Sequence, residues 1–192
     1  MSADDTPRTP VIGILVGSTR PVRAGRQLAD QIAELARLRS EADITVIDLA
    51  EVNLPWLDEP KMPALGDYQH EHTRAWARVI DGLDAVIVVS PQYNGGYPAP
   101  LKNAIDTVYA EWRDKPVLLV TYGFHGGSMA AQQLTQVFGV VKANLLEPPI
   151  AISATNDDRD ASGHLANPCE LVERHRAQLE VGFAAIHTAL GC

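Results

Sequence analysis

Short aliphatic runs alternate with longer amphipathic segments along this chain, and the alternation limits the fold more than any other feature. The runs are rich in Val, Ile and Leu, which is typical of strands buried on both faces. The longer segments repeat apolar residues at helical spacing. Strands and helices that alternate in this way form a parallel sheet covered by helices on both faces. The expected strands are 11–16, 43–49, 85–89, 116–121 and 144–150, and the expected helices are 27–39, 73–82, 98–112, 128–141 and 170–190.

Five strands of this kind predict a three-layer α/β/α fold of the doubly wound class, with one five-stranded parallel sheet. The last strand contains Pro148 and Pro149, which favour an edge position because proline cannot donate to a central ladder. A chain of 192 residues is the size of one domain. We therefore expect residues 11–192 to form a single domain after a flexible lead-in, residues 1–10. The proline-containing stretch 50–67 is expected to be irregular, wrapped over the surface or part of a subunit contact.

Charge and composition exclude several classes of protein. The net charge is −8, whereas nucleic-acid binders usually carry a basic patch. No apolar run approaches the roughly 20 residues that span a bilayer, and the polar N-terminus lacks the features of a signal peptide. Cys169 and Cys192 form no CxxC motif and are expected to be free thiols in a reducing compartment. We therefore expect a cytoplasmic protein without nucleic-acid or membrane partners, and any anionic ligand must be held by local positive charge.

The loop after the first expected strand, residues 17–26, carries the strongest chemical signal. Ligands of doubly wound sheets bind at the carboxyl ends of the strands, and this loop leads into a helix N-terminus that favours an anion. Arg20, Arg23 and Arg26 fall within seven residues, and arginine suits bidentate phosphate contacts. The loop has neither the GK[ST] ending of a Walker A motif nor a GxGxxG pattern. It therefore fits a phosphate monoester better than a triphosphate or a dinucleotide; the alternative is a solvated face of arginines.

Two further loops predict contacts with a flat ligand. Residues 90–98 combine proline and glycines, which allow close backbone approach, with Tyr93, whose ring can face a ligand, and Asn94, which can serve a turn or donate a hydrogen bond. Residues 122–128 are again glycine-rich and include His125, either a ligand contact or a surface histidine. The alternative for both loops is an ordinary strand–helix turn. One phosphate site beside two ring-bracketing loops matches FMN, which has one phosphate and one flat ring system.

Three motifs are together specific: Gly17-Ser18-Thr19-Arg20, SPQYNGGYP at 90–98 and LKNAID at 101–106. They are followed by Lys115-Pro116 and by Tyr122-Gly123 with Gly126-Gly127. Across about residues 11–150 the chain resembles the NADPH-dependent FMN reductase family. The resemblance implies a flavodoxin-like fold, a homodimer or homotetramer, and noncovalently bound FMN. It also implies oxidation of NADPH or NADH, with reduction of free flavins, quinones, azo compounds or metal oxyanions.

The resemblance also implies roles for particular residues. The phosphate contacts would come from the first loop, and the contacts to the flavin ring from the other two. This chain has Gln92 where many members have glutamate. It has Arg23 where several members have a small polar residue, and this difference leaves the phosphate contacts open. The predicted cofactor-binding residues are Ser18, Arg20, Arg23, Gly25, Arg26, Pro91, Gln92, Tyr93, Asn94, Gly95, Gly123, His125 and Gly126.

In such an enzyme FMN carries the chemistry, and NADPH and the acceptor react in turn in a ping-pong cycle. We therefore assign no catalytic acid or base and no metal ligand, and keep Tyr93 and His125 as candidates for proton delivery. One alternative is a flavodoxin-type electron carrier that does not oxidise NADPH itself. Another is a scaffold without flavin. A GxSxG hydrolase is excluded because no serine lies in that motif.

Overall fold

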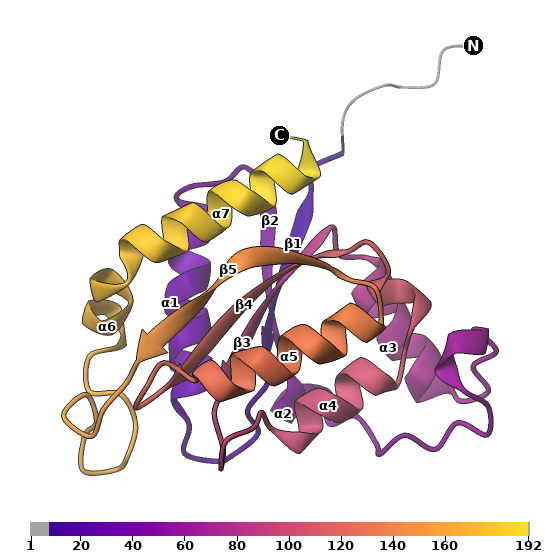
Figure 1. Cartoon of the computed structure of the whole chain (residues 1–192), viewed down its shortest axis with the longest axis horizontal. Helices are drawn as coiled ribbons and strands as arrows, with labels where there is room; N and C mark the ends of the chain where they lie inside the picture. The colour runs from indigo at the N-terminus through magenta and orange to yellow at the C-terminus, as the bar shows by residue number, and fades with distance from the viewer. Residues whose placement is uncertain (1–7, 192) are drawn as a thin grey trace.

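Five parallel strands form the centre of the computed structural model, which describes residues 8–191 (Figure 1). Their order is β2-β1-β3-β4-β5, which is the flavodoxin-like order, with the switch point between β1 and β3. The predicted three-layer fold with a five-stranded parallel sheet is confirmed, and so is the edge position of the last strand. The strands are β1 Val11–Val16, β2 Asp43–Asp48, β3 Ala85–Pro91, β4 Pro116–Gly123 and β5 Asn144–Ser153.

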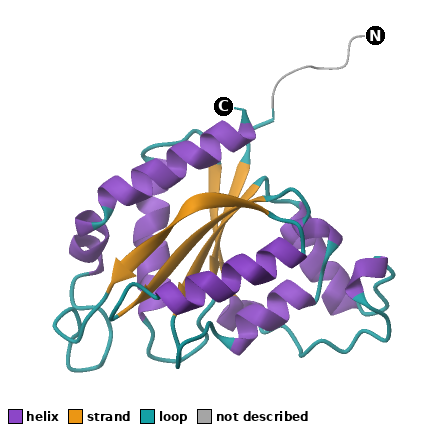
Figure 2. Ribbon diagram, viewed as in Figure 1, coloured by secondary structure: helices purple, strands orange, loops and turns teal. Residues whose placement is uncertain are grey.

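Helices cover both faces of the sheet, as Figure 2 shows. One face is covered by α1 Ala24–Arg37, α6 Pro168–Arg174 and α7 Arg176–Leu190. The other is covered by α3 Glu71–Asp81, α4 Ala99–Asp106 and α5 Ser128–Val140, together with the short elements α2 Leu49–Val52 and η2 Ala110–Trp112. The short helix η1 Pro63–Leu65 has no buried residue and lies in the stretch between α2 and α3. Within residues 8–191, no helix combines the length and apolarity needed to cross a membrane.

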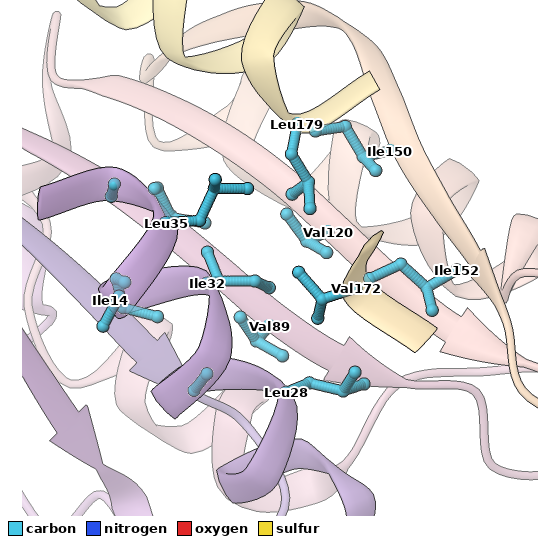
Figure 3. Close-up of a cluster of buried hydrophobic side chains, with 14 of the residues drawn as sticks. Ile14, Leu28, Ile32, Leu35, Val89, Val120, Ile150, Ile152, Val172 and Leu179 are labelled. Carbon is cyan, nitrogen blue, oxygen red and sulfur yellow. The ribbon is translucent and has the colours of Figure 1, made fainter. Parts of the chain in front are cut away.

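The core divides into two clusters, one on each face of the sheet. Figure 3 shows the first, in which Leu28 and Ile32 of α1 and Leu179 of α7 pack over strand residues. Successive strand residues point to opposite faces, so β3 contributes Val89 to this cluster and Val88 to the other. Every residue of β3 is buried, which explains why residues 85–89 of this strand are an unbroken aliphatic run in the sequence. The buried core holds the carboxyl ends of the strands in place for the loops that follow them.

The structure corrects the predicted helix 98–112, which is divided into α4 and η2. The backbone amide of Tyr109 donates to Tyr68 Oη at 3.2 Å and to the Glu111 carboxylate at 3.1 Å. The carbonyl of Ile105 accepts instead from the Trp112 indole at 3.1 Å. Tertiary partners thus replace helical hydrogen bonds, although the apolar stripe continues at helical spacing.

The predicted helix 170–190 is also divided, into α6 and α7. The break falls at His175, whose backbone is not helical and whose Nδ1 lies 2.9 Å from the carbonyl of Leu171. The helix predicted to begin at residue 27 begins earlier, at Ala24. The stretch 50–67 is mostly irregular, as expected, but includes most of α2 and all of η1.

The sequence predicts a flexible lead-in over residues 1–10. Residues 1–7 of it lie outside the described residues. Arg8 forms an ion pair with Asp84 at 2.6 Å, and the carbonyl of Pro10 accepts from the amide of Asp43 at 2.8 Å. Residues 8–10 are therefore attached to the edge of the sheet where the strands begin, the edge opposite the predicted ligand loops.

Candidate functional site

The loops after β1, β3, β4 and β5 line a cavity of about 470 Å³ at the carboxyl edge of the sheet. It lies beside the switch point at which a doubly wound sheet binds its ligand. The structure brings these predicted residues to its wall: Arg20, Arg23, Pro91, Gln92, Tyr93, Gly123 and His125. The wall also contains residues that the sequence did not predict to bind a cofactor: Val22, Ala24, Tyr122, Phe124, Ala154 and Arg159.

Ser18 and Gly25 lie beneath this wall and are buried. A Cβ atom at Gly25 would overlap Ser18 Oγ and lie 2.7 Å from Tyr122 Oη, so only glycine fits where α1 starts. Tyr122 Oη donates to Ser18 Oγ at 3.4 Å. Burial raises the pKa of Tyr122, so its hydroxyl stays neutral at physiological pH. Ser18, Gly25 and Tyr122 therefore set how closely the first loop approaches the end of β4.

The N-terminus of α1 opens at the cavity without a side-chain cap. The N-cap residue, Arg23, is extended, makes no capping hydrogen bond, and is followed by no acidic residue in the first turn. Its Nε is buried and has no hydrogen-bond partner among the described residues. Free amides, the positive end of the helix and an unpaired guanidinium donor together suit an anion.

The three predicted arginines of the first loop have different surroundings. Arg26 pairs with Asp30 at 2.9 Å, Glu51 at 2.6 Å and Asp48 at 3.3 Å. Its hydrogen bonds to Asp30 and Glu51 raise the pKa of its guanidinium. The structure does not bring Arg26 to the cavity wall.

Arg23 lines the cavity but also pairs with the buried carboxylate of Asp48, which in turn accepts from the amide of Ala50 at 3.0 Å. Arg20 has no carboxylate within ion-pair distance in residues 8–191, and its guanidinium carbon lies 5.9 Å from the centroid of the Tyr93 ring. Arg20 is thus the arginine of this loop whose charge is left for a ligand.

The loop after β3 is shaped by a tight turn. The amide of Tyr93 donates to the carbonyl of Gly96 at 2.7 Å, and that of Gly96 donates back at 2.9 Å. Asn94 and Gly95 between them have φ of 50° and 84°, as a type I′ turn requires. The structure therefore places both in the turn and away from the cavity wall, where they orient Tyr93.

Gln92 joins this loop to α5. Its Oε1 accepts from the amide of Met129 at 3.0 Å and from that of Ala130 at 3.4 Å, so the side chain satisfies free amides in the first turn of the helix. Gln92 also lines the cavity. A single side chain therefore fixes the β3 loop against the helix that follows β4.

Glycines shape the loop after β4. Gly126 has a φ of 67°, and a Cβ atom there would lie 2.6 Å from Cβ of Ala151. Its carbonyl accepts from Thr121 Oγ1 at 2.7 Å. Gly126 is therefore packed against β5 instead of lining the cavity, whereas Gly123 and His125 of the same loop line it.

Residues 10–157 match the family described as NADPH-dependent FMN reductase. An NAD(P)H-dependent FMN reductase from Schizosaccharomyces pombe is 38% identical over 91% of this chain and 88% of its own length. One from Saccharomyces cerevisiae is 39% identical over 70% of this chain and 76% of its own length. The chain therefore belongs to the NADPH-dependent FMN reductase family and is an oxidoreductase, as the sequence motifs predict.

A solved structure shares the fold. FerB from Paracoccus denitrificans, a flavoenzyme NAD(P)H:(acceptor) oxidoreductase, matches with a TM-score of 0.70 at 21% identity, over 94% of this chain and 99% of that chain. Further relatives carry the names quinone reductase, NADPH:quinone oxidoreductase and FMN-dependent NADPH-azoreductase. The chain thus shares its fold with a flavoenzyme, although few of the residues in the two sequences are identical.

The residues of the cavity fit FMN, the cofactor of the family. The uncapped start of α1 and the unpaired Nε of Arg23 offer donors to a phosphate. At the other end, Pro91 and Gly123 present little side chain, and Tyr93 presents a ring. Donors suited to a phosphate, together with small residues beside an aromatic ring in one cavity, are what FMN binding requires.

Proposed function

We propose that the protein binds FMN in this cavity and uses it to oxidise NADPH or NADH and reduce a small acceptor. The observation that carries the proposal is the joining of two chemistries in one cavity: the cationic, uncapped start of α1, and Pro91, Tyr93 and Gly123 of the β3 and β4 loops, which suit a flat ring. Bound FMN supplies the hydride and electron chemistry.

The chain's own residues bind and orient. Arg20, Arg23 and the first amides of α1 would hold the phosphate, while Ser18 and Gly25 would stay beneath them and set the loop. Gln92 keeps the ring loops aligned through its hydrogen bonds to α5. Four of the predicted residues would not contact FMN and would instead keep the loops in the shape that binding needs: Arg26, Asn94, Gly95 and Gly126.

We propose a ping-pong order, in which the reductant leaves before the acceptor enters. NADPH and the acceptor would both have to reach the flavin ring at this cavity, and their competition for the same face of the ring supports this order. The acceptor would be a free flavin, a quinone, an azo compound or a metal oxyanion, and the names of the relatives support the first three. Tyr93 and His125 line the cavity and remain the candidates for proton delivery.

The test is an absorbance spectrum of the purified protein with added FMN, followed by NADPH without oxygen. Flavin bands that shift on binding and bleach within seconds of NADPH addition would support the proposal. Bound flavin that stays oxidised with both NADPH and NADH would favour the alternative, a flavodoxin-type electron carrier. Protein that does not bind FMN would contradict both.

We also propose that the protein is a homodimer or homotetramer. Trp76 and Trp112 are buried in the core, whereas Trp56 is 69% exposed. Leu57, Met62 and Leu65 of the same irregular stretch are exposed as well, and such clustered apolar side chains often mark a subunit contact. Light scattering after size exclusion would measure the mass, and Trp56→Ser would lower it if this stretch forms the contact.

We propose a cytoplasmic location and a single domain over residues 11–192. Cys169 is free and exposed, which suits a reducing compartment. Cell fractionation would test the location. A single unfolding transition followed by two spectroscopic probes would support one domain, and two separate transitions would contradict it.

A further inference from the structure

The loop after β5 brings a guanidinium to the cavity from beyond the part of the chain that matches the family, residues 10–157. This loop, residues 154–166, is ordered by two aspartates. Asp158 accepts from the amide and hydroxyl of Thr155, at 2.8 and 3.1 Å, and pairs with Arg174. Asp160 accepts from the amides of Ser162 and His164, at 2.8 and 3.1 Å. Arg159 therefore lies between two residues that fix the backbone.

The same loop is attached to α1. Gln27 donates to the carbonyl of Leu165 at 3.1 Å and accepts from its amide at 2.9 Å. A Cβ atom at Gly163 would lie 3.3 Å from Val22 of the first loop, so the two loops are in contact. The position of Arg159 is thereby tied to the loop that is predicted to bind phosphate.

Arg159 has no carboxylate within ion-pair distance in the described part of the chain. Its Nη1 donates to the carbonyl of Gly163 at 2.8 Å, which fixes the side chain without neutralising it. Its positive charge, like that of Arg23, acts to lower the pKa of Tyr122 against the larger effect of burial. Arg159 and Arg20 are therefore two guanidinium groups without carboxylate partners on one cavity wall, in a chain whose net charge is −8.

We propose that Arg159 acts with Arg20 to bind a phosphomonoester dianion in this cavity. Two guanidinium groups that line the same cavity repel one another, and an anion of charge near −2 with three acceptor oxygens would offset both charges. Planar guanidinium groups bind such oxygens through paired N–H donors. The proposed function offers two sources, the 5′-phosphate of FMN and the 2′-phosphate of NADPH, and the inference rests on that function.

The first arm of the test compares FMN with riboflavin, which lacks the phosphate. Affinities are measured by quenching of flavin fluorescence for wild type, Arg159→Ala and Arg159→Lys. We expect Arg159→Ala to weaken FMN by about 10- to 100-fold and to leave riboflavin unchanged, as for a lost charged hydrogen bond. Arg159→Lys should recover part of the loss. Arg113→Ala is the matched control, because Arg113 is exposed, follows η2 and leaves the same net charge when removed.

The second arm compares NADPH with NADH as reductant by kcat/KM. Unchanged FMN affinity with a tenfold or larger fall in the preference for NADPH would support the proposal and assign the phosphate to the coenzyme. Equal losses of FMN and riboflavin would mean that Arg159 only supports its loop, and would overturn it. The proposal is also overturned if Arg159→Ala changes neither the ratio of FMN to riboflavin affinity nor the preference for NADPH over NADH. In that case, FMN binding and NADPH oxidation by the wild-type protein would still support the proposed function.

Discussion

The two ends of the cavity are built by different means. At the end near α1, side-chain charge dominates, with Arg20, Arg23 and Arg159 beside an uncapped helix. At the end near α4 and α5, backbone shape dominates, through the turn at Asn94 and Gly95 and the glycines of the β4 loop. The comparison teaches that the charged end should discriminate between ligands by their phosphate, whereas the shaped end should bind any flavin ring.

The largest expected effect lies at the shaped end. Gly126→Ala places a Cβ 2.6 Å from Ala151 at a φ of 67°, so both overlap and backbone strain oppose folding. We expect a loss of about 2–4 kcal/mol in the free energy of unfolding, measured in urea. FMN and riboflavin should weaken together, because the loop that faces the ring is displaced.

Gly139→Ala is the control for this substitution. Gly139 lies near the end of α5 with open space where a Cβ would stand, and alanine is the better helix former. It should leave the free energy of unfolding unchanged or raise it by up to about 1 kcal/mol. If Gly126→Ala and Gly139→Ala lower the free energy of unfolding equally, the shaped end of the cavity does not depend on the close packing of Gly126.

Arg20→Ala tests the charged end. Removing this guanidinium should weaken FMN by about 1.5–3 kcal/mol and leave riboflavin unchanged, as measured by titration of the two ligands. Arg26→Ala should have the smaller effect on the ratio of the two affinities, since Arg26 pairs with Asp30, Asp48 and Glu51. A larger effect for Arg26 would show that the ion pairs open when phosphate binds.

Gln92 sharpens the comparison because it bridges the loop and α5. Gln92→Ala removes the acceptor for the amides of Met129 and Ala130, which should cost about 1 kcal/mol in the free energy of unfolding. Gln92→Glu keeps an acceptor there and adds a negative charge at a helix N-terminus, so it should be at least as stable as wild type. Thermal unfolding of both variants measures this; a glutamate variant as unstable as the alanine one would count against the capping role.

Salt should give the smallest effect and separate the ends without mutation. Raising the ionic strength from about 0.05 to 0.5 M shortens the screening length and weakens attraction between the arginines and a phosphate. The affinity for FMN should fall several-fold while that for riboflavin stays level. Parallel salt dependence of the two ligands would show that charge contributes little at this cavity.

Much of the fold follows from local patterns. The strands are recognisable because buried parallel strands need apolar side chains on both faces, as in β3. The site's location also follows, since the carboxyl edge of such a sheet is the ligand edge and the glycine-bearing loops lie there. Individual contacts were harder to predict: the sequence did not indicate that Gly126 packs on Ala151 and does not line the cavity.

The sequence by itself determined the layered α/β architecture, the edge position of β5 and three of the loops that form the cavity, because each depends on residues close together in the chain. Only the tertiary structure brought the loop after β5 to the same cavity. Only the tertiary structure decided where two helices break and which arginines remain free. Tyr68 contacts Tyr109 from 41 residues away, and Arg26 of α1 pairs with Asp48 of β2 and Glu51 of α2. Spacing along the chain indicates the pair of Arg26 with Asp30, four residues on in the same helix. The pairs of Arg26 with Asp48 and Glu51, and the lack of a carboxylate partner for Arg20 and Arg159 among residues 8–191, depend on distance in space and could not be predicted.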